Sequence, residues 1–179
     1  GFGSIGRRVG ELGHAFGMSV LANCRTPRNP PSYSPFAFAS TDQIFQQADV
    51  ISLHCPLTDA TRAIINAKAL ARMKPGAILI NTARGSLIDS RALIDHIESG
   101  KIGAAGLDVV ENEFGMYYYD KKTDVMDNRE LAILKSFHNV VVTPHMAFYT
   151  NEAIRDMVYS SLKSCRLEAD GEKNPWLIQ

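Results

Sequence analysis

The chain has 179 residues, of which 45% are hydrophobic and 21% are charged, proportions that are typical of a globular domain and exclude a wholly disordered chain. The 19 Lys and Arg residues balance 19 Asp and Glu residues, and this zero net charge disfavours a nucleic-acid-binding surface. The apolar runs are too short to cross a bilayer. Three scattered cysteines suit a reducing, cytoplasmic setting better than a disulfide scaffold or a metal cluster.

The chain opens on a glycine-rich turn of the form G-x-G-x-x-G, which comprises Gly1, Gly3 and Gly6. In dinucleotide-binding folds the first glycine permits a tight turn, the second admits the pyrophosphate, and the third lets the helix pack close to the sheet. The helix that follows presents the amides of Ser4 and Ile5, and the positive end of its dipole, to phosphates. The turn predicts a dinucleotide site, and the alternative is an ordinary glycine turn.

A helix and a strand are predicted directly after this turn. Apolar residues recur at helical spacing over residues 5–16, and Gly17 ends the helix before a strand at 19–22. Dinucleotide-binding domains use this order of elements. The strand that should precede Gly1 is absent from the sequence, so we expect the chain to be a piece of a longer protein.

The same alternation continues along the chain. Strands are predicted at 49–54, 77–82, 103–109 and 140–143, and helices at 41–48, 66–73, 89–100, 129–137 and 150–167. Short apolar strands separated by helices predict an α/β fold, a Rossmann-type doubly wound parallel sheet with helices on both faces. The proline-rich stretch 25–39 and the stretch 112–128 are predicted loops. Asn66 and Asp89 are predicted helix caps.

Two domains are expected. Residues 1–145 would form a dinucleotide-binding domain that lacks its first strand, and residues 146–179 would form a C-terminal helix and tail. This helix carries an apolar stripe without a partner in the sequence, namely Ile154, Met157, Val158, Leu162 and Cys165. We therefore expect exposed apolar surface there, or a contact with another chain.

Three polar residues follow predicted strands, where an α/β sheet holds its ligands. They are Arg84, Glu113 and His145. An arginine binds a carboxylate with two parallel hydrogen bonds, a histidine moves a proton near neutral pH, and a neighbouring carboxylate raises the pKa of that histidine. Each residue alone also fits a structural or solvated role. Their shared placement beside a nucleotide motif suits redox chemistry on a 2-oxo acid.

Six motifs resemble those of the D-isomer-specific 2-hydroxyacid dehydrogenases, in the same order and at similar spacing. They lie at 1–6, 54–58, 73–77, 81–85, 106–109 and 143–145. Residues 111–176 look most like D-lactate dehydrogenases, whereas the first half, with its proline loop at 27–35, looks closer to glycerate dehydrogenases (hydroxypyruvate reductases). The family's catalytic domain precedes the glycine motif, so the final helix would return to a domain outside this chain.

The resemblance implies a nicotinamide-dependent oxidoreductase, most simply one that interconverts D-lactate and pyruvate. Hydroxypyruvate or glyoxylate reduction, and a non-catalytic module that senses NAD(P), are the alternatives. We expect a homodimer with a small 2-oxo or 2-hydroxy acid as substrate, and we expect this chain alone to be inactive.

The resemblance also implies roles for individual residues. Arg84 would bind the substrate carboxylate and carbonyl, His145 would exchange a proton with the carbonyl oxygen, and Glu113, rather than its near neighbour Glu111, would pair with His145. Asp108 would accept a hydrogen bond from the nicotinamide carboxamide, and Phe148 would border the substrate side chain. The remaining residues expected to contact the cofactor are His54, Cys55, Pro56, Thr82 and Ala83.

The strand at 19–22 departs from the usual NAD pattern at its end. An acidic residue is expected about 20 residues beyond the glycine motif, to bind the ribose 2′-hydroxyl. Cys24 and Arg25 stand there instead. Without a carboxylate to repel a 2′-phosphate, and with Arg25 and Arg28 available to pair with one, the sequence favours NADP over NAD. The alternative is that Arg25 lies over the adenine or in water.

Overall fold

The computed structural model describes residues 1–26, 29–113, 116–117 and 128–176. The chain divides into two compact units, Gly1–Pro144 and His145–Gln179. The division falls one residue before the predicted boundary, so His145 belongs to the second unit. Most of the predicted loop at 112–128 lies outside the described residues.

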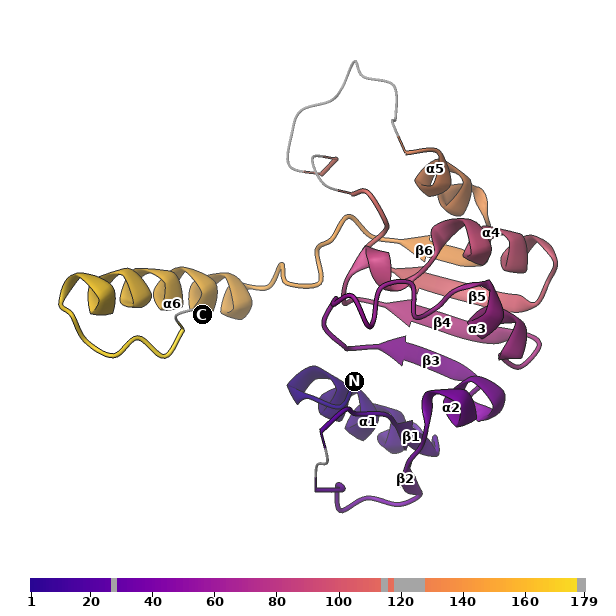
Figure 1. Ribbon diagram of the computed structural model, residues 1–179, viewed down its shortest axis with the longest axis horizontal. Coiled ribbons are helices and arrows are strands. Elements are labelled where there is room, and N and C mark those ends of the chain that lie inside the picture. The colour runs from indigo at the N-terminus through magenta and orange to yellow at the C-terminus, as the bar shows by residue number, and fades with distance from the viewer. Residues whose placement is uncertain (27–28, 114–115, 118–127, 177–179) are drawn as a thin grey trace. The chain divides into compact units, whose positions relative to one another are not determined.

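Helices and strands alternate along the first unit (Figure 1). The elements are α1 (Ser4–Ala15), β1 (Val20–Ala22), β2 (Phe36–Phe38), α2 (Thr41–Gln47), β3 (Val50–Leu53), α3 (Ala67–Arg72), β4 (Ala77–Asn81), the 3-10 turn η1 (Gly85–Leu87), α4 (Ser90–Glu98), β5 (Ile102–Leu107), α5 (Arg129–Ser136) and β6 (Val140–Val142). All except β2 and η1 were predicted, and their bounds agree to within a few residues.

The strands pair in parallel throughout. β1 pairs with β2, and a second sheet has the order β3-β4-β5-β6. Among the described strands, β1 and β3 are not hydrogen-bonded to each other. The predicted Rossmann-type fold class is confirmed.

Side-chain caps begin four helices of this unit. Asn66 accepts a hydrogen bond from the Ala69 amide at 3.1 Å, and Asp89 accepts one from Ala92 at 2.9 Å, as predicted. Ser40 and Asn128 cap α2 and α5 in the same way. These caps fix the residue at which each helix starts, and so fix the loops that precede them.

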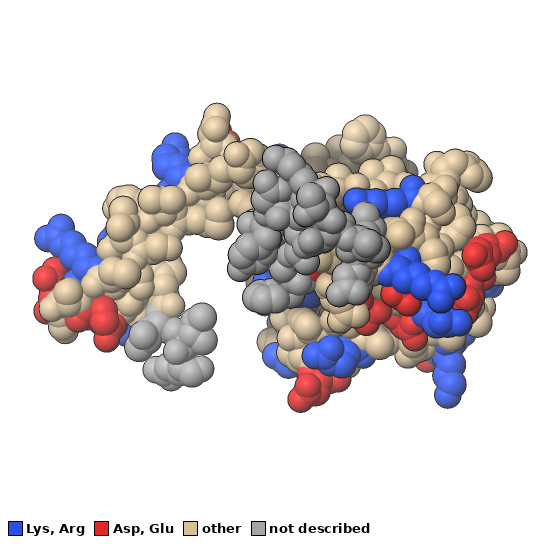
Figure 2. All heavy atoms as spheres, turned by 90° about the horizontal axis from the view of Figure 1, so that it is seen from above, with Lys and Arg blue, Asp and Glu red and all other residues tan. Residues whose placement is uncertain are grey.

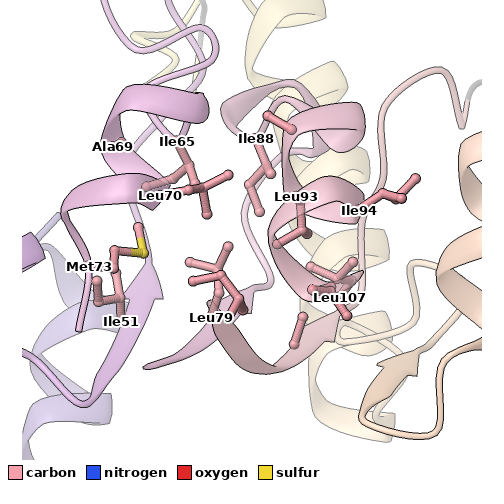
Figure 3. Close-up of a cluster of buried hydrophobic side chains, with 14 of the residues drawn as sticks. Ile51, Ile65, Ala69, Leu70, Met73, Leu79, Ile88, Leu93, Ile94 and Leu107 are labelled. Atoms are coloured by element: carbon pink, nitrogen blue, oxygen red, sulfur yellow. The ribbon is translucent and has the colours of Figure 1, made fainter. Parts of the chain in front are cut away.

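The core lies on one face of the four-stranded sheet. Leu79 on β4 is fully buried beneath Leu70 of α3 and Leu93 of α4 (Figure 3). The other face is partly open, because Ile78 and Val141 are exposed. The surface view shows basic and acidic side chains interspersed on the first unit, in keeping with the zero net charge (Figure 2).

The prediction of a continuous loop at 25–39 is wrong, because Phe36–Phe38 forms β2. The strand has three residues, too few to show a period, and among the described strands it pairs only with β1. The prolines around it favour a loop reading. It is held by aromatic packing: the Phe2 ring lies 5.2 Å from the Phe36 ring and 5.8 Å from the Phe38 ring.

The second unit is built on one helix, α6 (Asn151–Ala169), which Thr150 caps. In the described chain none of its residues is buried, and Met157, Val158 and Leu162 expose their apolar side chains, as predicted for the stripe. The tail folds back on the helix, since Asn174 Nδ2 donates to Ser164 Oγ at 2.8 Å. Among the described residues no helix is long and apolar enough to cross a membrane.

Candidate active site

The glycine turn leaves the start of α1 open. Gly3 is the N-cap residue and has no side chain with which to cap the helix, and a Cβ built on it would meet nothing within 4 Å. The first turn, which includes Ser4 and Ile5, contains no acidic residue. An uncapped helix start with free space above it is what a pyrophosphate requires.

The other two glycines of the motif are fixed by close backbone contacts. A Cβ on Gly1 would come within 2.5 Å of the His54 carbonyl oxygen, and one on Gly6 within 2.3 Å of the Gly1 carbonyl oxygen. A side chain at either position would force the backbone apart. The turn therefore rests on the chain that leaves β3.

His54 lies beneath this turn. Its Nε2 is 2.8 Å from Ser52 Oγ, and burial lowers the pKa of His54 below its ordinary value of 6.5. Cys55 is half-buried, and the Pro56 carbonyl accepts a hydrogen bond from Thr61 Oγ1 at 2.7 Å. Burial of the imidazole favours its neutral form.

A pocket of about 370 Å³ lies at the carboxyl end of β1. Its lining residues are Ala22, Asn23, Cys24, Arg25, Phe38, Ala39, Ser40 and Gln43. Asn23 Nδ2 donates to the Ala39 carbonyl at 2.9 Å, which ties the ends of β1 and β2 together. Within the described residues no carboxylate lines this pocket, and Arg25 is its only cation. Arg28 lies outside the described residues.

The register of the larger sheet brings the other strand ends into one row. Leu53, Asn81, Leu107 and Val142 are successive partners across β3, β4, β5 and β6. The residues that follow them in the chain are His54, Thr82, Asp108 and Thr143. Asp108 donates its amide to the Asn81 carbonyl at 2.9 Å, and Asp108 Oδ1 accepts from Thr143 Oγ1 at 2.5 Å. These bonds join the ends of β4, β5 and β6.

Arg84 lies on the turn that leaves β4, with its side chain exposed. The buried Asn81 side chain holds this turn, since its Nδ2 donates to the Arg84 carbonyl at 2.9 Å and its Oδ1 accepts from the Ala83 amide at 3.0 Å. A Cβ on Gly85 would come within 2.0 Å of the Val110 carbonyl oxygen. The chain after β4 therefore packs directly on the chain after β5.

Glu113 lies on that second segment. Its Oε2 accepts a hydrogen bond from the Val110 amide at 3.0 Å, so the carboxylate folds back towards the end of β5. Glu113 also contributes to raising the pKa of Tyr117, although burial of the phenol is the larger cause. Arg84, Asp108 and Glu113 thus lie on loops that contact one another.

His145 and Phe148 belong to the second unit. His145 follows Thr143 by two residues and has a φ of +53°, a left-handed conformation that is uncommon for a residue with a side chain. Phe148 is half-buried, and its ring meets the Tyr149 ring edge to face at 6.1 Å.

Sequence reasoning assigned no role to three residues that organise the site. Asn81 is fully buried, and the two others are Gly85 and Thr143, which make the contacts described above. A polar residue at the end of an apolar strand is a usable signal for Asn81, because a buried amide must find hydrogen-bond partners. The contacts of Gly85 and Thr143 join segments far apart in the sequence and leave no local pattern.

The comparisons with known proteins agree with this geometry. Residues 1–147 match the profile of the D-isomer specific 2-hydroxyacid dehydrogenase, NAD binding domain. The chain is 43% identical to an aromatic 2-oxoacid reductase of Clostridium sporogenes, over 90% of this chain and 49% of that protein. It is 42% identical to a D-specific alpha-keto acid dehydrogenase of Enterococcus faecium, over 92% of this chain and 50% of the relative.

Solved structures show the same likeness. A D-lactate dehydrogenase of Treponema pallidum superposes with a TM-score of 0.92 at 37% identity, over 100% of this chain and 54% of that one. The D-lactate dehydrogenase of Lactobacillus jensenii with NAD+ gives 0.87 at 37% identity, over 99% and 53%. The chain therefore belongs to the D-isomer specific 2-hydroxyacid dehydrogenase family and carries its NAD-binding domain. It spans about half the length of the curated relatives it matches.

Proposed function

We propose that the chain is the coenzyme-binding half of an enzyme that reduces a small 2-oxo acid to the D-2-hydroxy acid, with pyruvate and D-lactate as the first pair. The observation that carries this proposal is the row of joined strand ends. It sets the uncapped glycine turn on one end of the row and the loops of Arg84, Asp108 and Glu113 on the others.

The residues of the row fit a nicotinamide dinucleotide. The start of α1, from Gly3 to Gly6, would hold the pyrophosphate, and Asp108 would accept a hydrogen bond from the carboxamide. Support comes from Asp108, a buried carboxylate at a strand end, and from the open space above Gly3. The other assigned contacts are His54, Cys55, Pro56, Thr82 and Ala83. When bound, the nicotinamide supplies or accepts the hydride.

The choice between NADP and NAD is assigned to the pocket at the end of β1. We place the adenosine ribose beside Cys24 and Arg25. A 2′-phosphate there meets a cation and no carboxylate among the described lining residues, so NADP is accepted and slightly favoured. NAD is accepted as a cofactor too, because its 2′-hydroxyl needs only one hydrogen-bond partner.

This chain's own residues would carry the proton and the substrate. Arg84 binds the substrate carboxylate with its planar guanidinium. Its Nη1 donates to the Ala83 carbonyl at 2.7 Å, and none of the ion pairs among the described residues involves it. His145 gives a proton from its imidazole to the carbonyl oxygen in reduction and takes it back in oxidation. Glu113 pairs with His145 and stabilises its charged form. Phe148 borders the substrate side chain.

Larger 2-oxo acids are the second candidate substrates. The observation that favours them is the 43% identity to an aromatic 2-oxoacid reductase, which is higher than the 37% identity to the D-lactate dehydrogenase structures. Both substrate classes share the carboxylate that Arg84 would bind. They differ in the side chain, and therefore in the pocket that would hold it.

The test is a panel of pyruvate, hydroxypyruvate, glyoxylate and phenylpyruvate, assayed with NADH and NADPH on the full-length protein. We expect D-specific reduction of at least one acid, and a loss of kcat of at least about 100-fold in His145→Gln. Activity without that loss would contradict the role of His145. Nucleotide binding without reduction of any acid would favour a sensing module instead.

The proposal extends to assembly and location. Exposed apolar side chains on α1, among them Ile5 and Phe16, give a second copy a surface to cover, so we propose a homodimer. Sedimentation at several protein concentrations tests it.

Free thiols at Cys24, Cys55 and Cys165, all within the described chain, support a reducing cytoplasm.

A further inference from the structure

Two glutamates, two residues apart, point their carboxylates at different neighbours. Glu111 Oε2 accepts a hydrogen bond at 2.8 Å from the amide of Ser90, the first residue of α4. Glu113 Oε2 accepts one from Val110, on its own segment. Glu111 therefore ties the chain after β5 to a helix, whereas Glu113 folds back on that chain.

The backbone of Glu111 is held from the opposite side. Asn128 Nδ2 donates to the Glu111 carbonyl oxygen at 2.8 Å, and the same nitrogen lies 3.7 Å from Met116 Sδ. Asn128 Oδ1 accepts from the Leu131 amide at 2.9 Å, which caps α5. Asn128 is only 6% exposed, so these bonds are protected from water. Glu111 thus joins the N-terminal ends of α4 and α5.

This junction lies in the middle of the segment that carries the proposed site. Asp108 precedes Glu111 by three residues and Glu113 follows it by two. Asn112 between the glutamates has a φ of +56°, so the turn has a specific backbone geometry that other residues must hold. Through the contact of Val110 with Gly85, the same segment also supports the turn that carries Arg84.

We propose that Glu111 is a positioning residue for the dehydrogenase reaction, fixing the segment of Asp108 and Glu113 through its bond to α4. The inference rests on the proposed function, because the roles of Asp108 and Glu113 are assigned there. What the bond needs is an oxygen that accepts from the Ser90 amide. A glutamine also supplies such an oxygen, without the charge that strengthens a bond to a helix N-terminus, whereas an alanine supplies none.

The first test compares Glu111→Ala with Glu111→Gln in the full-length protein. We expect Glu111→Ala to lower kcat about 10- to 100-fold, the range for a catalytic group displaced by a fraction of an ångström to 1 Å, with a smaller change in KM for the cofactor. Glu111→Gln should restore most of kcat and keep the wild-type pH profile, whereas Glu113→Gln should change the profile. A Glu111→Gln variant as impaired as Glu111→Ala would overturn the proposal, because it would make the charge itself essential.

The second test removes the hydrogen bond from Asn128 to the Glu111 carbonyl oxygen. Asn128→Asp keeps the oxygen that caps α5 and removes the donor to the Glu111 carbonyl. The matched control is Asn66→Asp, which makes the same change at the cap of α3, where Nδ2 donates to the Ala63 carbonyl at 3.1 Å. We expect kcat to fall in Asn128→Asp and not in Asn66→Asp. Equal kcat in the two variants would contradict the inference.

A third readout does not depend on activity. Hydrogen exchange reports the amides of Ser90 and Val110, which donate to Glu111 and Glu113. Both should be protected in the wild type and lose protection in Glu111→Ala, and Ser90 should regain it in Glu111→Gln. If the wild type reduces no 2-oxo acid, the proposed function fails, while this measurement still decides whether Glu111 holds the segment of Asp108 and Glu113 in place. Unchanged protection in Glu111→Ala overturns it.

Discussion

Arg84 is exposed at the end of β4, where its carbonyl accepts a hydrogen bond from Asn81 and its guanidinium donates one to the Ala83 carbonyl. Arg84→Lys keeps the charge but loses the planar pair of donors, so it should raise KM for the 2-oxo acid and lower kcat. The expected loss is about 1.5–3 kcal/mol of transition-state stabilisation, roughly 10- to 150-fold in kcat/KM. Arg72→Lys, at an exposed ion pair with Asp42, is the matched control and should keep wild-type kinetics. Unchanged kcat/KM in Arg84→Lys would place Arg84 outside the site.

We expect Arg25 to set the cofactor preference in the proposed ribose pocket. Arg25→Ala should lower kcat/KM for NADPH about tenfold, the lower end for a hydrogen bond to a charged group because the side chain is exposed, and should affect NADH less. Cys24→Asp should act in the same direction, since a carboxylate repels the 2′-phosphate and binds the 2′-hydroxyl. Both ratios are read at fixed ionic strength, because salt screens exposed charges. An unchanged NADPH/NADH ratio in Arg25→Ala would show that Arg25 does not contact the 2′-phosphate.

At the scale of the element, substitutions at two glycines of α1 distinguish an effect on cofactor binding from an effect on helix stability. Gly6→Ala places a methyl group 2.3 Å from the Gly1 carbonyl oxygen, so the turn must open. We expect cofactor affinity to fall about 5- to 150-fold, because the cost of overpacking is about 1–3 kcal/mol. Isothermal titration with NADH and NADPH measures it.

Gly13→Ala is the matched control on the same helix. A Cβ there would lie 3.7 Å from Met18 Sδ, an ordinary contact. Alanine should stabilise the helix by about 0.5–1 kcal/mol and leave affinity unchanged. If Gly6→Ala binds cofactor as the wild type does, the glycine turn is not the pyrophosphate site.

The alternation of elements was predictable because its signals are local. Asn66 and Asp89 cap the helices that the sequence assigns to them, and the apolar runs before Asn81 and Thr143 form strands. The strand at Phe36–Phe38 was missed because its stability comes from β1 and from the Phe2 ring rather than from its own pattern.

The candidate site was predictable only in part. A position after a predicted strand marks Arg84, Glu113 and His145, since parallel strands end at one edge of a sheet. Asp108 lies inside the strand predicted at 103–109, so only the family resemblance assigns it a role. The bonds that connect these ends, from Asp108 to Thr143 and from Glu111 to Ser90, span 35 and 21 residues. Tertiary packing alone creates such contacts, so they leave no periodicity in the sequence.

At the scale of the whole molecule, apolar faces remain open in the described chain besides the α1 surface proposed for a second copy. One is the sheet face with Ile78 and Val141, and another is the stripe of Met157, Val158 and Leu162 on α6. Because the chain spans about half the length of its relatives, we expect the remainder of a full-length protein to cover such faces. Stability in the full-length protein should therefore exceed that of the chain alone.

The stability of the whole molecule should also depend on pH through His54. Burial lowers its folded-state pKa, so below about pH 6.5 the unfolded state binds a proton that the folded state resists. The contribution of His54 is fully present above pH 6.5 and is lost as the pH falls towards the folded-state pKa, with a slope of at most about 1.4 kcal/mol per pH unit for one proton. Urea unfolding of the full-length protein from pH 8 to pH 5 measures this slope. His54→Gln should flatten it, since an amide keeps a polar group near Ser52 and does not titrate. An equal slope in the two proteins would show that the imidazole beneath the glycine turn takes up its proton as easily in the folded state as in the unfolded chain.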